Sequence, residues 1–163
     1  MHASPPCQRY SKASICRPGL AARYPDLIPP VRRALRKLGK PSIIENVPGS
    51  PLTNPVTLCG TMFGLGADFP PHGPVELQRH RLFESSVPLV APRPCNHQVT
   101  AIRIFGHGRP GNSELRGPGY AEAGREAMGI WWMNRDQLDE AIPPAYANQV
   151  GGQVLRRLKV MAA

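Results

Sequence analysis

A cysteine stands directly behind two prolines near the start of the chain, in residues 2–11, which read HASPPCQRYS. Proline fixes its own φ and pushes the preceding residue into extended conformations, so Pro5 and Pro6 hold Cys7 on a stiff, non-helical segment. Such a segment presents a side chain instead of burying it. A thiol becomes a strong nucleophile when it ionises, which nearby positive charge promotes. The alternative is a structural cysteine that packs as a small hydrophobe.

A carboxyl group follows a short apolar run further along the chain. Residues 42–49, SIIENVPG, predict a short buried strand of β-branched residues that is broken by Pro48 and Gly49 just beyond Glu45 and Asn46. A carboxyl group at this position can serve acid catalysis, and it works best if burial raises its pKa. A glutamate at a strand end that is simply exposed to water is the alternative.

A helix is predicted between these two groups, in residues 25–41. Pro29 and Pro30 suit its first turn and Gly39 stops it. The apolar stripe is Val31, Leu35 and Leu38, and the wet face is Arg32, Arg33, Arg36 and Lys37. A strand, a helix and a strand in this spacing form a βαβ unit of a parallel sheet. Ligands of open α/β sheets bind outside the carboxyl ends of the strands, so Cys7 and Glu45 are expected to share one cleft.

The remaining elements are read from periodicity. Short strands are predicted in HRLFE, residues 80–84, and TAIRIF, residues 100–105, whereas residues 106–124 are rich in Gly, Pro and Arg and predict a loop. Helices are predicted in residues 135–142 and 143–160. On the second of these, Ala147, Val150, Val154 and Leu158 fall on one face. Gly151 and Gly152 interrupt it, which predicts a close backbone contact there.

Composition limits the function classes. The chain has 163 residues, 41% of them hydrophobic, which favours one globular unit. Twenty Lys and Arg against eleven Asp and Glu give a net charge of +9, which favours polyanionic partners such as nucleic acid over a merely solvated surface. No run of eighteen apolar residues and no signal-peptide pattern is present, so a cytoplasmic location is expected. The four cysteines lack CxxC spacing and suit free thiols.

Four strings in this sequence, in this order, resemble the motifs of the DNA (cytosine-5) methyltransferase family. They are PPCQRYS around Cys7, ENV at residues 45–47, QRHRLFE at residues 78–84 and AIPPAYANQVG at residues 141–151. Their order and spacing agree with the family from the first residues to nearly the last. The resemblance implies an α/β fold of the Rossmann-like type that uses S-adenosyl-L-methionine, with a small target-recognition insert.

The resemblance implies a catalytic role for four residues. Cys7 matches the cysteine that attacks C6 of a cytosine, which makes C5 nucleophilic enough to accept a methyl group from S-adenosyl-L-methionine. Glu45 matches the carboxyl group that bonds N3 and the exocyclic amine of that base. Arg79 and Arg81 match the paired arginines that contact the target nucleotide, and alternation puts both on one face of a strand. Where the family has a glutamine two residues before the first arginine, this chain has Leu77, and the glutamine is Gln78.

The same resemblance implies that double-stranded DNA is the partner and that the target base is flipped out of the helix. Sequence choice would come from residues 85–123, where Arg93, Arg103, Arg109 and Arg116, with His107 and Asn112, are available to contact bases or phosphates. Gln8 and Ser11, in the cysteine motif, are further candidates for DNA contact. Tyr146, Asn148 and Val150 lie in the last motif and are the candidates for cofactor binding.

One family feature is missing from the sequence. Family members begin with a strand and a glycine-rich turn that holds the cofactor, and the string MFGLGAD at residues 62–68 is no substitute, because Asp68 and prolines follow it at once. The fold is therefore expected to be incomplete: residues 1–84 as a catalytic half that begins mid-fold, 85–123 as a recognition region, and 124–163 as returning helices. A split enzyme with a partner chain that supplies the cofactor half, an inactive remnant, and a misplaced start remain alternatives. A prokaryotic or viral origin, inside a host cell, is expected.

Two alternative interpretations of the sequence assign it to other functional classes. Without a cofactor half, the chain could be a catalytically inactive DNA-binding module that keeps a basic surface. A zinc site at Cys95, Asn96 and His97 is disfavoured, because two ligands one residue apart have no second pair at metal spacing. His72 and His80 are interpreted as surface or pocket residues.

Overall fold

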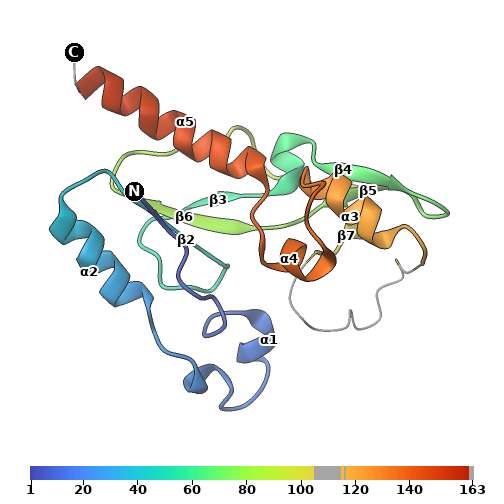
Figure 1. Ribbon diagram of the computed structural model, residues 1–163, viewed down its shortest axis with the longest axis horizontal. Helices are drawn as coiled ribbons and strands as arrows, with labels where there is room; N and C mark the ends of the chain where they lie inside the picture. The colour runs from blue at the N-terminus through green and yellow to red at the C-terminus, as the bar shows by residue number, and fades with distance from the viewer. Residues whose placement is uncertain (105–114, 116, 162–163) are drawn as a thin grey trace. The chain divides into compact units, whose positions relative to one another are not determined.

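The computed structural model describes residues 1–104, 115 and 117–161 as a mixture of helices and strands with two small sheets (Figure 1). The α/β class predicted from the sequence is confirmed, while the Rossmann-like arrangement stays a prediction. The chain divides into two compact units. The first unit comprises residues 1–57, 80–90 and the segment that starts at 154, and the second comprises residues 58–79 and 91–153. The three regions expected from the resemblance are divisions by function, and their bounds stay a prediction.

The sheet of the first unit has the order β1-β2-β6-β3. Its strands are β1 (His2–Ala3), β2 (Ile43–Asn46), β6 (Arg81–Ser85) and β3 (Val56–Leu58). β1 pairs with β2 in parallel, with Ala3 opposite Ile44, so the predicted βαβ unit is confirmed. β6 pairs with β2 in the antiparallel direction, with Glu45 opposite Phe83. The sheet is therefore mixed, not purely parallel.

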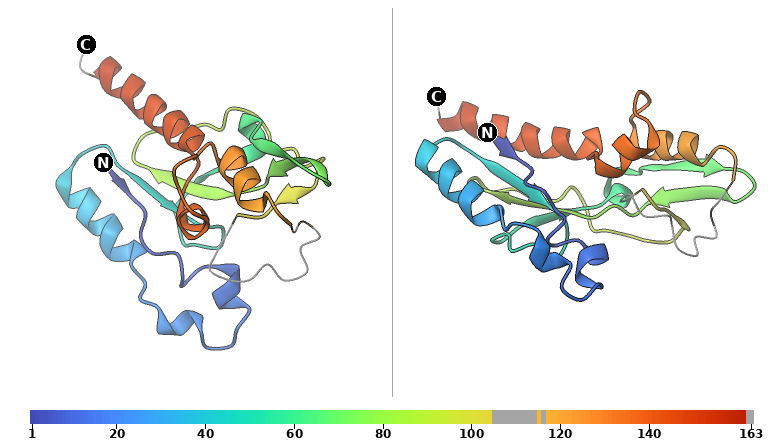
Figure 2. Two further views of the ribbon diagram at one scale, coloured as in Figure 1. Left: turned by 45° about the vertical axis from the view of Figure 1, so that its right-hand side comes forward. Right: turned by 60° about the horizontal axis from the view of Figure 1, so that its bottom comes forward.

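The predicted first helix is α2 (Ile28–Leu38), which begins with two prolines in its first turn and ends at Gly39 in the left-handed conformation, φ 61°. Figure 2 shows α2 running alongside β2. Its buried residues are Ile28 and Leu35, whereas Leu38 is 54% exposed, so the predicted apolar stripe is wrong at its last position. Residues 28 and 35 are seven apart and share one helical face, while position 38 lies in the last turn, beyond that contact.

The second unit contains the sheet β4-β5-β7, in which β4 (Gly66–Phe69) and β5 (Gly73–Leu77) form an antiparallel pair and β7 (Ala101–Ile102) runs parallel to β5. α3 (Tyr120–Met128) packs against β4 and β5, as Figure 2 shows. The core here includes Phe69, Leu77, Ile102, Ala127, Met128 and Leu138. Trp131 and Trp132, which follow α3, are 64% and 72% exposed and take no part in this core.

The loop predicted over residues 106–124 is wrong at its end, since residues 120–124 belong to α3, and residues 105–114 and 116 lie outside the described chain. Gly124 made this helix hard to predict, because glycine is a poor helix former. The packing explains it: a Cβ at Gly124 would lie 2.8 Å from Ile104 Cδ1, so the helix can approach residue 104 only without a side chain there.

Two further helices follow α3. α4 (Arg135–Glu140) starts with a capping box in which Asn134 and Gln137 bond each other's backbone. α5 (Pro144–Met161) has Tyr146, Val150 and Val154 buried, while Ala147 is exposed and Leu158 is 37% exposed, so the predicted apolar face is wrong at its two ends. A Cβ at Gly151 would meet nothing within 4 Å, so the expected close contact is wrong at Gly151, whereas at Gly152 it stays a prediction. Among the described residues no helix has both the length and the apolar character needed to cross a bilayer.

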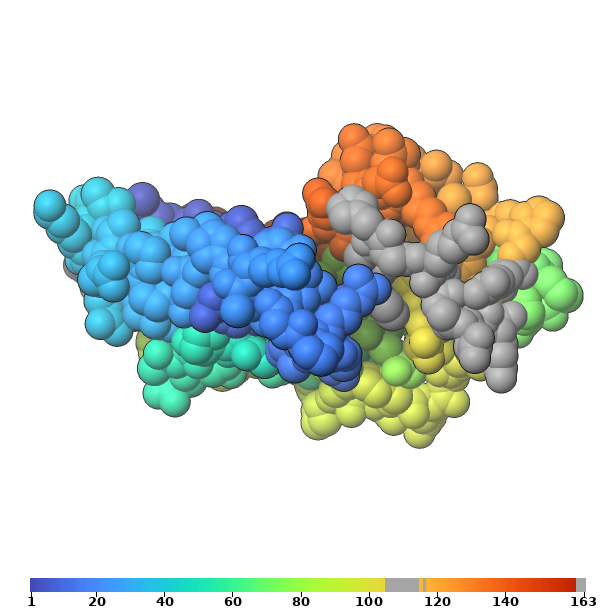
Figure 3. Space-filling view, turned by 90° about the horizontal axis from the view of Figure 1, so that it is seen from below, coloured from blue at the N-terminus to red at the C-terminus, as the bar shows by residue number. Residues whose placement is uncertain are grey.

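The short elements lie in the connections. α1 (Lys12–Ile15) and the 3-10 helix η1 (Ala21–Arg23) form the segment between β1 and α2, and the 3-10 helix η2 (Gly60–Phe63) precedes β4. In the space-filling view, this segment and α2 (blue) make up a continuous stretch of the surface of the first unit (Figure 3).

Candidate active site

The cysteine motif and the glutamate motif meet at one edge of the first sheet. β1 and β2 are parallel neighbours, so their carboxyl ends point to the same edge. Beyond β1, the Pro5 carbonyl accepts a buried hydrogen bond of 2.8 Å from Asn46 Nδ2. Asn46 is 1% exposed, and its amide would be costly to bury without a partner. This bond fixes the segment that leads to Cys7 at the residue next to Glu45.

Cys7 is a free, half-buried thiol at the start of a turn. The Tyr10 amide donates to the Cys7 carbonyl at 2.9 Å, which closes the turn, and Gln8 is exposed beside it. The two prolines before Cys7 keep the chain out of a helix, as the sequence predicts. The thiol therefore has the partial exposure that a nucleophile needs in order to meet a substrate.

Glu45 is 6% exposed and forms an ion pair with Arg81, whose Nε lies 3.2 Å from Glu45 Oε1. The two residues come from adjacent antiparallel strands, because Glu45 stands opposite Phe83, two positions from Arg81. A carboxylate buried this deeply requires such a partner. The pair holds the Glu45 carboxyl in one orientation.

The segment after Cys7 is braced by side-chain contacts. Ser11 caps α1 by accepting a hydrogen bond from the Ser14 amide at 3.3 Å, and the Arg9 guanidinium donates to the Tyr24 carbonyl at 2.7 Å. The Tyr10 hydroxyl donates to the Asp26 carboxylate. Burial, then this hydrogen bond, raises the pKa of Tyr10 to about 12. The Ser11 hydroxyl, a candidate for DNA contact, is thus also a helix cap.

Arg79 lies in the interior of the second unit, 4% exposed. Its guanidinium donates to the Ile104 carbonyl, to the Asp139 carbonyl at 2.7 Å and to the Ala141 carbonyl at 2.8 Å. β6 begins only at Arg81, so the expectation that both arginines occupy one strand face is wrong. Arg79 joins the C-terminal end of α4 to Ile104, which follows β7, and its role in nucleotide contact stays a prediction.

The three cofactor candidates on α5 differ in how far their side chains are exposed. Tyr146 is fully buried, its ring centroid lies 5.2 Å from that of Phe63 with the two rings tilted by 32°, and its hydroxyl donates to the Arg79 carbonyl at 2.5 Å. Val150 is 4% exposed, and Asn148 is exposed. Only Asn148 therefore offers its side chain at the surface, and the cofactor role of the three stays a prediction.

The predicted DNA-contacting arginines also differ. Arg93 donates through Nε to the Met62 carbonyl at 2.7 Å and through Nη2 to the Thr61 carbonyl at 3.0 Å, so its guanidinium braces the second unit. Arg103 is exposed, and its carbonyl accepts a hydrogen bond from the Tyr120 hydroxyl at 2.6 Å. Arg109 and Arg116, with His107 and Asn112, lie outside the described residues.

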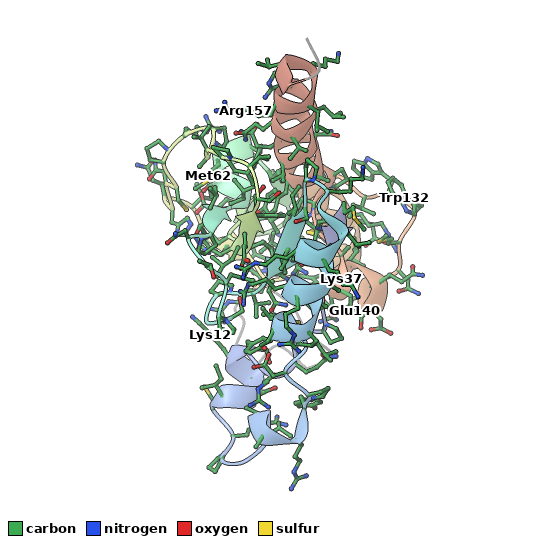
Figure 4. The ribbon with its side chains drawn as sticks, turned by 90° about the vertical axis from the view of Figure 1, so that its left-hand side faces the viewer. Lys12, Lys37, Met62, Trp132, Glu140 and Arg157 are labelled. Atoms are coloured by element: carbon green, nitrogen blue, oxygen red, sulfur yellow. The ribbon has the colours of Figure 1, made fainter. Side chains whose placement is uncertain are left out.

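Positive charge is concentrated in the first part of the chain. Residues 1–57 contain two acidic side chains, Asp26 and Glu45, against nine basic ones. The basic residues are Arg9, Lys12, Arg17, Arg23, Arg32, Arg33, Arg36, Lys37 and Lys40. Lys37 lies on the outward side of α2 (Figure 4) and is exposed. Such an excess creates a positive potential that attracts polyanions.

A cluster of two thiols and an imidazole in the second unit was not predicted from the sequence. Cys59 directly precedes η2, and its Sγ lies 3.4 Å from His97 Nε2. Cys95 Sγ lies 2.8 Å from the same nitrogen. Burial raises the pKa of the Cys59 thiol, and the neighbouring Cys95 adds to that effect. The sequence signal was only the Cys-x-His spacing of residues 95 and 97, because Cys59 comes 38 residues before His97.

Comparison of the chain with models of known protein families, with curated proteins and with solved structures gave no match in any of the three.

Proposed function

We propose that this chain is the catalytic portion of a DNA (cytosine-5) methyltransferase, which transfers a methyl group from S-adenosyl-L-methionine to C5 of a cytosine flipped out of double-stranded DNA. The single observation that carries the proposal is the bond from Asn46 to the Pro5 carbonyl. It joins the segment that leads to the thiol of Cys7 to the residue adjacent to the buried carboxyl of Glu45. A nucleophile and an acid on one strand edge are the two groups that addition to a pyrimidine requires.

The proposed chemistry begins with the thiolate of Cys7, which forms a bond to C6 of the base. The electron pair of the C5–C6 double bond moves to C5, while Glu45, once it is protonated, donates a hydrogen bond to N3 and so stabilises the adduct. C5 would then take the methyl group from the sulfonium sulfur of S-adenosyl-L-methionine, whose S–CH₃ bond breaks so that S-adenosyl-L-homocysteine leaves. Loss of the C5 proton to a base, followed by departure of the Cys7 thiolate, restores the double bond. Arg81 acts as a positioning residue that holds Glu45 in place.

The other roles follow from the resemblance. Phosphate contacts from basic side chains supply affinity, and the excess of nine basic over two acidic residues in positions 1–57 supports this part of the proposal. S-adenosyl-L-methionine is the methyl donor, and a partner chain that supplies a cofactor-binding half is part of the proposal. Asn148 is the exposed candidate on α5 for contact with the cofactor.

Exchange of the cytosine C5 hydrogen tests the proposal without a methyl donor, because reversible addition of Cys7 to C6 makes that hydrogen labile. Mixed-sequence duplex DNA labelled with tritium at C5 is incubated with the chain, and tritium released to water is counted. We expect release that Cys7→Ser abolishes and that Glu45→Gln slows by about 10²–10⁴-fold. Cys16→Ser, at a second free cysteine outside the proposed site, is the matched control and should leave release unchanged.

Capture of the intermediate gives a second readout. A duplex that carries 5-fluorocytosine, with S-adenosyl-L-methionine added, should give a covalent adduct on the peptide that contains Cys7, seen by mass spectrometry. DNA binding without tritium release, both for the chain alone and for the chain with a cofactor-binding partner, would refute the catalytic proposal. That result would establish the second candidate, a DNA-binding module without chemistry, which the positive charge of residues 1–57 favours independently of Cys7.

A further inference from the structure

Three side chains with metal-binding atoms converge in the second unit, and none of them is assigned to the proposed catalysis. They come from Cys59, Cys95 and His97, and their ligand atoms lie within 4.8 Å of one another. His97 Nε2 faces both sulfurs, at 3.4 Å from Cys59 Sγ and at 2.8 Å from Cys95 Sγ. Cysteines that only fill apolar space need no polar partner, whereas both of these thiols face the same nitrogen, His97 Nε2.

The spacing of these atoms suits a tetrahedral metal ion. Zinc holds a thiolate sulfur at about 2.3 Å and an imidazole nitrogen at about 2.0–2.1 Å, so neighbouring ligand atoms around the ion lie about 3.4–3.8 Å apart. The distance of 3.4 Å between Cys59 and His97 lies in that range. The 2.8 Å between Cys95 and His97 must widen, which the exposed position of both residues permits.

A hydroxyl group supports the two sulfurs from outside. Thr61 Oγ1 donates to Cys59 Sγ at 3.4 Å and lies 3.5 Å from Cys95 Sγ. Groups that hydrogen-bond metal ligands hold the ligands in orientation and affect metal affinity. Thr61 therefore occupies the position of such a supporting group, at the first turn of η2, which starts just after Cys59.

The chain around Cys95 needs an anchor of this kind. Residues 91–100 are all exposed and form no helix or strand, so burial contributes little to their order. The contacts of this stretch with η2 include the Arg93 bonds to the Met62 and Thr61 carbonyls and the cluster itself. Cys59, by contrast, is fully buried and fixed at the start of η2. A metal ion that joins the two would fasten a poorly packed loop to a rigid element.

We propose that Cys59, Cys95 and His97 bind a structural zinc ion that fastens residues 91–100 to η2. The two thiols lose their protons to solvent when zinc binds, and the neutral imidazole donates its Nε2 lone pair. This Cys₂His set leaves the fourth zinc position to water or to a further side chain. The inference is independent of the proposed methyltransferase function, because it uses none of the residues assigned to that chemistry.

Metal content and cobalt spectra test the proposal on the full chain. Purified under reducing conditions from zinc-containing medium, the protein should hold about one zinc ion per chain. Cobalt added to the metal-free chain should give the visible absorption of a tetrahedral site and the near-ultraviolet sulfur-to-cobalt band. Cys59→Ser, Cys95→Ser and His97→Gln should each weaken both bands, and Thr61→Val should lower metal affinity by about 10–100-fold.

Controls separate a built site from incidental thiol binding. Cys7→Ser and Cys16→Ser remove free cysteines outside the cluster and should leave zinc content and cobalt spectra unchanged. If Cys59→Ser fails to fold, His97→Gln and Thr61→Val still test the site, because both retain the buried thiol. The proposal is overturned if the parent chain gives no thiolate-to-cobalt band, if Cys16→Ser lowers metal content as much as Cys95→Ser, or if Cys59 and Cys95 are joined by a disulfide after reducing purification.

Discussion

Arg32 and Glu84 lie 52 residues apart in the chain, yet the Arg32 guanidinium makes two parallel hydrogen bonds to the Glu84 carboxylate, of 2.7 Å from Nε and 2.6 Å from Nη2. This bidentate pair ties α2 to β6, and the same carboxylate accepts a bond from the Thr53 amide at 2.8 Å. The sequence placed Arg32 on the wet face of its helix, and the fold places it half-buried against the sheet. The pair holds the helix that connects the two motifs of the candidate active site.

Removal of the Glu84 charge should destabilise the protein. Glu84→Gln leaves Arg32 with a weaker partner in a partly buried place, so the free energy of unfolding should fall by about 1–3 kcal/mol, as measured by urea unfolding. The matched control is Glu122→Gln, which breaks an exposed pair with Arg125 and should change stability by about 0.5 kcal/mol or less. Equal effects of the two substitutions would contradict the assigned role of the Arg32–Glu84 pair.

The Glu84 carboxylate should also make the free energy of unfolding depend on pH. Burial raises the pKa of Glu84, but the bonds from Arg32 and from the Thr53 amide outweigh burial and hold the pKa below its ordinary value. The unfolded chain then takes up this proton at higher pH than the folded one, so the stabilisation is present above the ordinary carboxyl range and is lost as pH falls through the lower folded value. Urea unfolding between neutral pH and acid should show a steeper loss for the parent than for Glu84→Gln. If the free energy of unfolding falls equally with pH in both proteins, the prediction is contradicted.

Gly60 should not tolerate a side chain. A Cβ at this position would lie 2.2 Å from the Leu77 carbonyl oxygen and 2.7 Å from Leu77 Cβ, so Gly60→Ala must push η2 away from β5. We expect a loss of about 1–3 kcal/mol in the free energy of unfolding. Gly151→Ala is the control in open space within α5 and should stabilise by about 0.5–1 kcal/mol, because alanine is the better helix former. A neutral Gly60→Ala would show that η2 does not pack on β5 as described.

Arg93 and Arg103 should separate structural from DNA-binding arginines. Arg103→Gln removes an exposed charge, so it should lower the slope of log affinity against log salt by about 0.9 if Arg103 contacts a phosphate, with stability unchanged. Arg93→Gln loses two bonds to backbone carbonyls and should cost about 1–3 kcal/mol of stability. Salt titrations of duplex binding and thermal melts of both variants make the comparison. The assignment fails if Arg103→Gln melts earlier and Arg93→Gln does not.

Local signals in the sequence were sufficient for several elements. Two prolines at the first turn and Gly39 at the end predicted α2, and a run of β-branched residues before Pro48 predicted β2. The sequence also placed the motifs of Cys7 and Glu45 at the ends of neighbouring parallel strands, because a strand, a helix and a strand with this spacing have few topologies open to them. These features depend on residues close together in the chain.

The tertiary structure alone decided what depends on distant residues. The start of α3 was not predicted because Gly124 is typical of loops. The reason for a glycine at this position is visible only in the fold, where Ile104 packs so closely that a side chain would collide with it. Arg79 points inward because its guanidinium bonds the carbonyl of Ile104 and two carbonyls at the end of α4, all of which come later in the chain. The contact between Cys59 and His97 forms because packing brings together two segments that are 38 residues apart, which no spacing rule predicts. Periodicity and caps act over a few residues, whereas these contacts are set by how separate elements pack, and no short stretch of sequence carries that information.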